Sequence, residues 1–225
     1  MDDSKALTSE DYTALFKIKR AIYLIWKRIG DILVSLIGLI LLIPITIIIK
    51  IAYMCTGDFH SIIFTQDRIG KDGKHFKFYK FRSMVPNADE VLFMALAKDE
   101  KMAEEYAMNK KLKNDPRITK IGRIIRKASI DETPQFINIF LGDMSLIGNR
   151  PYLPREKKDM GKAYNDIIKT KPGLTGYWQV SGRSDTTFKK RLELETYYSK
   201  HAGFKIDTKI FFKTFKVVLG GKGAD

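Results

Sequence analysis

An uncharged run of eighteen residues, positions 32–49, constrains this 225-residue chain more than any other feature of its sequence. A bilayer core about 30 Å thick requires about 20 apolar residues in a spanning helix, so the run stands at the lower limit of length. The run is apolar on every side, which argues against a helix buried in a soluble protein. We therefore expect a membrane helix here.

Pro44 lies two-thirds of the way along this run. A proline inside a helix removes one backbone hydrogen bond and kinks the helix. A kinked helix of this length can enter one leaflet and return to the same face, whereas a spanning helix with a tolerated proline explains the same residues. Basic residues stand at both ends of the run, so charge does not orient it. The residues alone leave both topologies open.

The chain carries 40 basic and 26 acidic residues, a net charge of +14. Such a surplus favours anionic partners, whether nucleic acid, anionic lipid or phosphorylated substrates. No base-reading or zinc-finger pattern is present, so we expect no nucleic-acid partner. Cys55 is the single cysteine, which excludes an intrachain disulfide and a cysteine-cluster metal site. The glycine-rich phosphate loop and the serine hydrolase elbow are also missing.

The remaining pattern predicts an α+β fold, mostly helical with a small β-hairpin. Residues 1–19 are polar and are expected to form a loose arm, residues 20–56 the membrane helix, and residues 57–225 the catalytic domain. Two β-like runs, 61–68 and 74–82, are joined by Asp72-Gly73, a favoured hairpin pair. Helical patterns cover residues 87–113, 119–127, 187–200 and 204–219. The last is amphipathic and carries four lysines, as expected for an interfacial helix on an anionic membrane.

Two adjacent carboxylates, Asp131 and Glu132, precede a predicted helix start at Thr133-Pro134, with the threonine as cap and the proline as first residue. A capping box from Ser129 to Glu132 is the alternative, but it would place the proline too deep in the helix. A carboxylate among cations stays ionised and can attack phosphorus as a nucleophile. Residues of this kind at a helix start are more commonly structural, so both interpretations stay open at this point.

Four arginines stand in short segments rich in glycine, serine or proline, where a guanidinium group can bind phosphate through two hydrogen bonds. The usual fate of an arginine is a solvated surface position, so these segments by themselves are suggestive only. The four are Arg82, Arg126, Arg150 and Arg183.

The order of several motifs resembles the bacterial sugar transferases, the monotopic phosphoglycosyl transferases. The family's core signature is matched by residues 115–151, DPRITKIGRIIRKASIDETPQFINIFLGDMSLIGNRP. Its second signature is matched by residues 66–84, QDRIGKDGKHFKFYKFRSM. Residues 27–31, KRIGD, resemble the start of the family's membrane helix. Residues 171–183, KPGLTGYWQVSGR, resemble a motif of the family's hexose-phosphate branch. The resemblance runs from about residue 27 to the C-terminus.

This resemblance implies that Asp131 is the nucleophile that takes a hexose phosphate from a UDP-sugar and releases UMP, with Glu132 as its partner carboxylate. It also implies a Mg²⁺ ion beside Asp131, and attack by polyprenol phosphate on the covalent intermediate in a ping-pong cycle. Arg150 corresponds to the arginine of the family's Pro-Arg-Pro motif, which contacts the nucleotide-sugar. Arg82, Arg126, Lys127 and Arg183 are looser assignments as phosphate-binding or structural partners.

The family's hydrophobic helix is re-entrant, which favours a single-leaflet helix broken at Pro44 on the cytoplasmic face of the bacterial inner membrane. Three departures from the family pattern stand out: Ile43 replaces a serine, Thr133 replaces a leucine, and Asn149 replaces the first proline of Pro-Arg-Pro. We expect the last change to make the loop that carries Arg150 less rigid.

The substrates implied are a UDP-sugar, with UDP-galactose or UDP-glucose favoured, and undecaprenyl phosphate, in the first membrane step of polysaccharide or glycan assembly. The sequence leaves open which sugar is used, the exact polyprenol, the pathway and the oligomeric state, a homodimer included. A basic membrane-associated binding protein is the alternative from another class, which the retained Asp131-Glu132 pair argues against.

Overall fold

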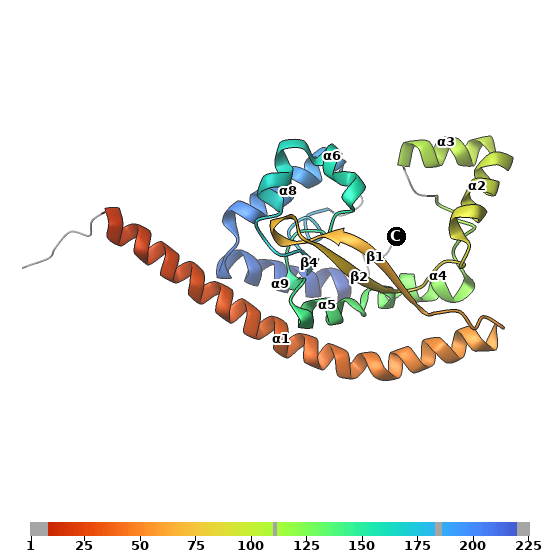
Figure 1. Cartoon of the computed structure of the whole chain (residues 1–225), viewed down its shortest axis with the longest axis horizontal. Helices are drawn as coiled ribbons and strands as arrows, with labels where there is room; N and C mark the ends of the chain where they lie inside the picture. Colours follow the sequence, from red (N-terminus) through yellow and green to blue (C-terminus); the bar gives the residue numbers. More distant parts are fainter. Residues whose placement is uncertain (1–8, 110–111, 183–185, 220–225) are drawn as a thin grey trace, which may run out of the picture. The chain divides into compact units, whose positions relative to one another are not determined.

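The computed structural model describes residues 9–109, 112–182 and 186–219 and has a mostly helical α+β fold (Figure 1). The helices and strands are α1 (Ser9–Cys55), β1 (Ile63–Ile69), η1 (Lys71–Gly73), β2 (His75–Phe81), α2 (Ala88–Lys98), α3 (Glu100–Asn109), α4 (Lys120–Lys127), η2 (Ile130–Glu132), α5 (Gln135–Leu141), β3 (Ser145–Ile147), η3 (Pro154–Glu156), α6 (Lys157–Met160), η4 (Gly161–Ala163), α7 (Tyr164–Ile167), β4 (Gly173–Thr175), α8 (Phe188–His201) and α9 (Phe204–Leu219).

The described residues form two compact units. The first contains residues 9–37, 67–76 and 136–219, and the second contains residues 38–66 and 77–135. Helix α1 and the β1–β2 hairpin each contribute to both units.

Helix α1 is a single continuous helix of 47 residues that passes through Pro44 (Figure 1). It begins at Ser9, so the prediction of a loose arm is wrong for residues 9–19, which extend the helix instead. Within the described ranges, α1 is the one helix long and apolar enough to cross a membrane. Many of its apolar side chains are exposed, Ile40 by 67% and Ile48 by 65%. The re-entrant topology stays a prediction.

The predicted β-hairpin is confirmed, with β1 and β2 paired in a two-stranded sheet. Its turn contains Asp72 at φ 56° and Gly73 at φ 79°. This left-handed backbone suits Asp and Gly, which is why the pair favours a two-residue reversal between antiparallel strands. The turn is tied to the first unit because the Asp72 amide donates to the Ile168 carbonyl oxygen over 2.8 Å.

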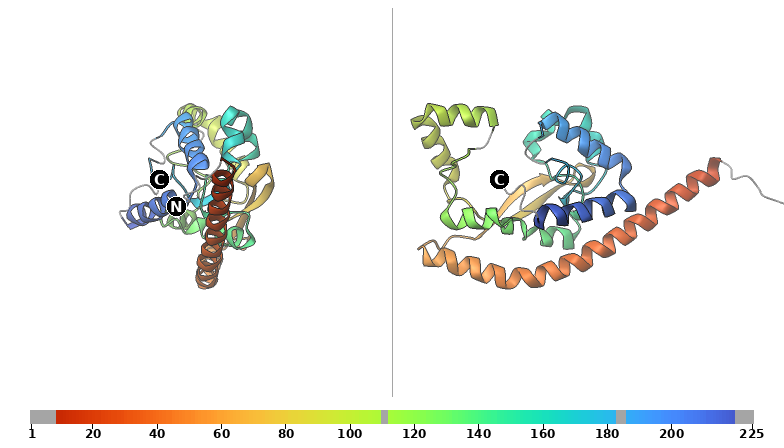
Figure 2. Two further views of the ribbon diagram at one scale, coloured as in Figure 1. Left: turned by 90° about the vertical axis from the view of Figure 1, so that its left-hand side faces the viewer. Right: turned by 180° about the vertical axis from the view of Figure 1, so that it is seen from behind.

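The second unit contains the helices predicted between residues 87 and 127. The first pattern is divided into α2 and α3, which meet end to end at a sharp angle in Figure 2. Asp99 between them accepts a hydrogen bond from the Met102 amide over 3.1 Å. Helix α4 begins as predicted after Thr119, whose hydroxyl accepts a hydrogen bond from the Gly122 amide over 2.8 Å. Such a cap satisfies an amide that has no partner inside the helix.

In the first unit, β3 and β4 pair in parallel, with Ser145 opposite Gly173 and Ile147 opposite Thr175. Helices α8 and α9 confirm the two predicted C-terminal helices. Ile210 of α9 is fully buried in a core cluster with Ile147 and Tyr198. Four phenylalanines of α9 are exposed, as expected for an interfacial helix: Phe204, Phe211, Phe212 and Phe215.

Gly122 fixes the packing of α4 against the segment after β2. A methyl group at this position would lie 1.9 Å from the backbone oxygen of Ser83, which cannot move without displacing the strand. Gly122→Ala is therefore expected to lower the free energy of unfolding by about 1–3 kcal/mol, since overpacking forces backbone shifts. Thermal unfolding in detergent measures this.

The matched control is Gly30→Ala in α1, where a methyl group would meet no atom within 4 Å. This variant is expected to be neutral or slightly stabilised, because alanine favours a helix over glycine. A Gly122→Ala protein as stable as the unmodified chain would contradict the packing assignment.

Candidate functional site

The two carboxylates singled out in the sequence lie in η2, directly after α4. Ser129 before them is left-handed, φ 54°, and its side chain makes no cap, so the alternative capping box does not form. Helix α5 begins at Gln135, which confirms the later helix start. Thr133 does not cap that helix through its side chain as predicted, because its hydroxyl donates to the Ile130 carbonyl oxygen over 2.8 Å. The carboxylates therefore stand in a tight turn between two helices.

Lys80 of β2 brings the two carboxylates together. Its Nζ lies 2.8 Å from Oε1 of Glu132 and 3.6 Å from Oδ2 of Asp131. The side chain of Asp131 is 11% exposed and that of Glu132 is 45% exposed. The inner carboxylate is thus the sheltered member of the pair, and the outer one holds the lysine more closely.

Burial is the largest influence on Asp131 and raises the pKa of its carboxyl group above the ordinary value. The Lys80 ammonium lowers that pKa, the neighbouring Glu132 raises it, and Arg126 lowers it. Loss of solvation disfavours the charged form, and a nearby cation restores it. An ionised Asp131 therefore depends on Lys80 and, to a smaller extent, on Arg126.

Lys80 is the functional residue of this cluster that sequence reasoning missed. It lies within the segment 66–84 that resembles a family signature, but no spacing rule connects a strand residue with a turn 50 positions later. The pairing is a tertiary contact, visible only once β2 and η2 are placed side by side.

Arg126 and Lys127 occupy the last turn of α4, where both side chains are exposed. Arg126 is held by its Nε, which donates to the Ser83 hydroxyl over 2.9 Å. Its position beside the carboxylate turn is consistent with binding an anionic group there.

Arg82 is 8% exposed and makes the contacts of a structural partner, while phosphate binding by this residue stays a prediction. Its guanidinium group donates to the carbonyl oxygens of Ser61 and Met84 and to Oδ2 of Asp58, over 2.7, 3.1 and 2.9 Å. It also lies 4.6 Å from the ring centroid of Tyr53. Because these contacts occupy all three nitrogens, Arg82 ties the end of β2 to the segment after α1.

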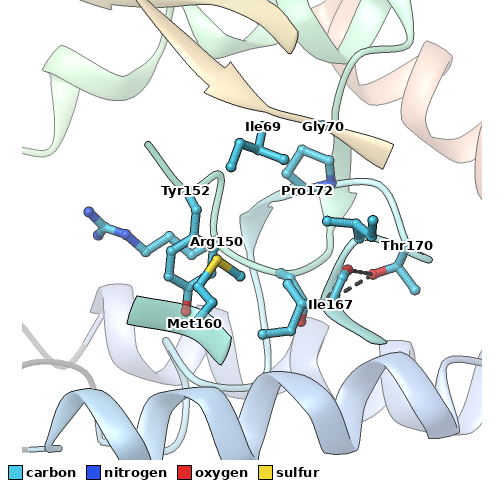
Figure 3. Close-up of a pocket in the computed structure, with 10 residues that line it drawn as sticks. Ile69, Gly70, Arg150, Tyr152, Met160, Ile167, Thr170 and Pro172 are labelled. Carbon is cyan, nitrogen blue, oxygen red and sulfur yellow. Dashed lines mark hydrogen bonds between the residues drawn. The ribbon is translucent and has the colours of Figure 1, made fainter. Parts of the chain in front are cut away.

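Arg150 belongs to the first unit, on the segment that follows β3. Its amide donates to Oε1 of Glu195 on α8 over 3.1 Å, and its guanidinium carbon lies 6.0 Å from the ring centroid of Trp178. In Figure 3 the Arg150 side chain extends away from the apolar residues Tyr152, Met160 and Ile167, which line a small cavity. This leaves the guanidinium group half-buried at the edge of the cavity. Arg183 lies outside the described residues.

The cavity itself has a volume of about 10 Å³, enough for about one water molecule. Asn149 lines it, 2% exposed, with its Nδ2 bonded to α8 and to the segment around α7. The expectation that Asn149 would leave the Arg150 segment less rigid is not supported by this arrangement, because side-chain hydrogen bonds take the place of the proline ring.

The residues present suit a Mg²⁺ ion held by few protein ligands. No group of three or more His, Cys, Asp or Glu side chains that could hold a metal occurs among the residues the structure describes. Mg²⁺ commonly binds one or two carboxylates together with substrate phosphates. Asp131 and Glu132 provide adjacent carboxylates of this kind.

Glu195 is the buried titratable group beneath Arg150, only 1% exposed. Burial raises its pKa to about 7, although Tyr152, the Arg150 amide and the Arg150 and Arg191 guanidinium groups act in the other direction. A folded-state pKa above the ordinary value of 4.5 means that the folded chain binds the extra proton. The protonated Glu195 side chain therefore contributes to the free energy of unfolding at low pH, and this contribution is lost as the pH rises through the folded-state pKa.

Glu195→Gln should remove this dependence, so its melting temperature should fall less between pH 5 and pH 7.5 than that of the unmodified chain. Melting curves in detergent at a series of pH values measure the difference. Glu193→Gln, on the same helix and 53% exposed, is the control and should retain the original slope. Equal slopes for all three proteins would contradict the burial of a protonating carboxyl group.

Comparison with known proteins shows the family of the chain. The family model described as bacterial sugar transferase matches residues 22–221. The undecaprenyl-phosphate galactose phosphotransferase of Salmonella typhimurium is 44% identical over 198 residues, 88% of this chain and 41% of that protein. The exopolysaccharide production protein ExoY of Sinorhizobium fredii is 37% identical over 198 residues, 88% of this chain and 87% of the relative.

A third relative is the UDP-glucose:undecaprenyl-phosphate glucose-1-phosphate transferase of Escherichia coli, 36% identical over 197 residues, 84% of this chain and 39% of that protein. The chain thus spans about two-fifths of the length of several curated relatives. The match includes both the carboxylate turn and the Arg150 segment. The chain belongs to the bacterial sugar transferase family.

Proposed function

We propose that this chain is a phosphoglycosyl transferase that moves a hexose 1-phosphate from a UDP-sugar to undecaprenyl phosphate. The observation that carries the proposal is the sheltered Asp131 carboxylate, 3.6 Å from the Lys80 ammonium group, in the core of the family match. The relatives named for galactose and glucose transfer support UDP-galactose or UDP-glucose as donor.

In the first step a carboxylate oxygen of Asp131 attacks the phosphorus that bears the sugar. A bond from Asp131 to phosphorus forms, and the bond from that phosphorus to the bridging oxygen of the diphosphate breaks. The electron pair leaves with the bridging oxygen, so UMP departs and a hexose phosphate remains on Asp131. No oxidant or reductant is required.

In the second step an oxygen of undecaprenyl phosphate attacks the same phosphorus. The new bond gives a lipid diphosphate sugar, and the bond to Asp131 breaks to return the free carboxylate. Two displacements at one phosphorus explain why a single nucleophile serves both substrates in turn. A ping-pong kinetic pattern is the result expected for such a cycle.

Lys80 keeps Asp131 ionised before attack, and Arg126 adds positive charge beside the carboxylate turn. Arg150 contacts the nucleotide-sugar, Lys127 adds a further exposed cation, and Glu132 holds Lys80 over 2.8 Å. A Mg²⁺ ion held by Asp131, with Glu132 beside it, would neutralise the charge of the diphosphate.

The apolar α1 and the exposed aromatic side chains of α9 support an association with the membrane, and the cytoplasmic face of the inner membrane is the location that we propose. A helix α1 that enters a single leaflet would hold the active site at the depth of the lipid headgroups, although α1 is not broken at Pro44 as the sequence predicted. Relatives named for exopolysaccharide production support a role in polysaccharide assembly.

Asp131→Asn is expected to lower UMP release by at least about 1,000-fold, because an amide oxygen is a poor nucleophile and cannot be regenerated as a carboxylate. UMP is measured with UDP-galactose and with UDP-glucose, in the presence of Mg²⁺ and undecaprenyl phosphate. Asp72→Asn in the exposed hairpin turn is the control and should keep full activity, because asparagine accepts its left-handed backbone.

An active Asp131→Asn enzyme would overturn the assignment of the nucleophile. An unmodified protein that releases no UMP from any of a panel of UDP-sugars would overturn the proposed activity and favour a binding role.

Lys80→Gln is expected to lower kcat/KM at neutral pH by about 100-fold, as for loss of one charged group at a reacting phosphate. Because the Lys80 ammonium lowers the pKa of Asp131, its removal raises that pKa further. The acidic limb of the profile of kcat/KM against pH should therefore move to higher pH. Lys74→Gln, exposed in the hairpin, is the control and should leave the profile unchanged. A lower rate with an unshifted acidic limb would contradict the role of Lys80 in ionising Asp131.

A further inference from the structure

Asn149 differs from the family's Pro-Arg-Pro pattern, and its side chain is nearly inaccessible at 2% exposure. We propose that Asn149 and Ser199 form a hydrogen-bonded lock that positions Arg150 for the nucleotide-sugar. The proposal rests on the proposed function of Arg150. It makes Asn149 and Ser199 positioning residues that act through Arg150.

The side chain of Asn149 is tied to three acceptors in the first unit. Its Nδ2 lies 2.6 Å from the Ser199 hydroxyl, 3.2 Å from the Thr170 hydroxyl and 3.2 Å from the Ile167 carbonyl oxygen. The two hydrogens of Nδ2 serve these three acceptors. One hydrogen makes the short bond to Ser199, and the Thr170 hydroxyl and the Ile167 carbonyl oxygen share the other. Ser199 is itself 7% exposed, which shields that bond from water.

The main chain of the same segment is held on both sides. The Asn149 carbonyl oxygen accepts a hydrogen bond from the Gly173 amide over 2.8 Å. The next amide, that of Arg150, donates to Glu195 over 3.1 Å. Glu195 and Ser199 are four residues apart on α8 and therefore lie on one face of that helix. One helix face thus holds two consecutive residues of the segment.

These contacts replace what a proline ring would supply. A proline restricts its own φ to about −65° and needs no partner. Asn149 has no such restriction, so its side-chain bonds to α8 and to the segment around α7 add to the main-chain bonds with Gly173 and Glu195 that hold this backbone. Loss of the side-chain bonds loosens the segment and lets the Arg150 side chain change direction.

Arg150 itself is arranged to bind an anion. Its Nε is buried and makes no hydrogen bond to the described part of the chain, and its guanidinium group lies beside the Trp178 ring. Arg191 lies on the same ring at 4.3 Å. Arg150 as a whole is partly exposed, and a partly exposed guanidinium group is suited to donate to a phosphate oxygen of the nucleotide-sugar.

The kinetic test uses the full-length enzyme with Ser199→Ala. We expect the KM for the UDP-sugar to rise about fivefold, the effect of one lost buried hydrogen bond, while kcat stays within about twofold. Glu193→Gln, on the exposed side of α8, should leave both constants unchanged.

The lock acts through Arg150, so its effect must vanish when that arginine is removed. Arg150→Ala with Ser199→Ala should have the same KM as Arg150→Ala alone. The proposal would be overturned by a Ser199→Ala enzyme with unchanged KM, or by a double variant whose change in KM is the sum of the two single changes. UMP release by the unmodified enzyme would still uphold the proposed function in that case.

Trp178 gives a readout that requires no activity. With Trp26→Phe, Trp178 is the single tryptophan of the chain, and its fluorescence reports on the adjacent Arg150 guanidinium group. Ser199→Ala should change the emission of Trp178, whereas Glu193→Gln should not. Identical spectra for the three proteins would overturn the lock even if the enzyme proved to use another substrate.

Discussion

The ion pair between Lys80 and the Asp131–Glu132 turn is the interaction on which the account of this protein depends. A carboxylate that is 89% removed from solvent tends to take up a proton, and a neighbouring carboxylate strengthens that tendency. The ammonium group of Lys80 opposes both effects. The fold supplies this ammonium group by placing β2 beside the turn that follows α4. Gly122 allows α4 to pack closely on the main chain of Ser83.

The first unit solves a different problem, how to hold an arginine in a segment without regular structure. Parallel pairing of β3 with β4 fixes the start of the segment, and α8 fixes its next two residues through Ser199 and Glu195. Buried polar contacts of this kind specify geometry because each unmade bond would leave a polar group without water or partner. The guanidinium group of Arg150 lies beside Trp178, and the nucleotide-sugar is the ligand that we propose for it.

The parts of the fold that follow from local rules were predictable from the sequence. Asp72-Gly73 predicts the hairpin, Thr119 the start of α4, and the lysine and phenylalanine spacing α9. Helix α1 extends to Ser9 because a polar segment can continue a helix that is already stabilised by its apolar neighbour, which pattern alone does not reveal.

The candidate site was predictable only in part. Asp131 and Glu132 could be singled out by their place in a family motif. Lys80 contacts the carboxylate turn in the second unit, and Glu195 and Ser199 contact the Arg150 segment in the first unit, in each case across a long stretch of sequence. Arg82 shows the opposite case, since its segment suggested phosphate binding but its nitrogens are occupied by Ser61, Met84 and Asp58.

The central claim is that Asp131 carries the sugar phosphate covalently. The most direct measurement mixes the enzyme with UDP-sugar in the absence of lipid acceptor, stops the reaction rapidly and determines the intact mass. The account predicts one added hexose phosphate, assigned by peptide fragmentation to Asp131 and converted to a hydroxamate by hydroxylamine. An enzyme that turns over with acceptor yet shows neither the adduct nor the hydroxamate at Asp131 would contradict it.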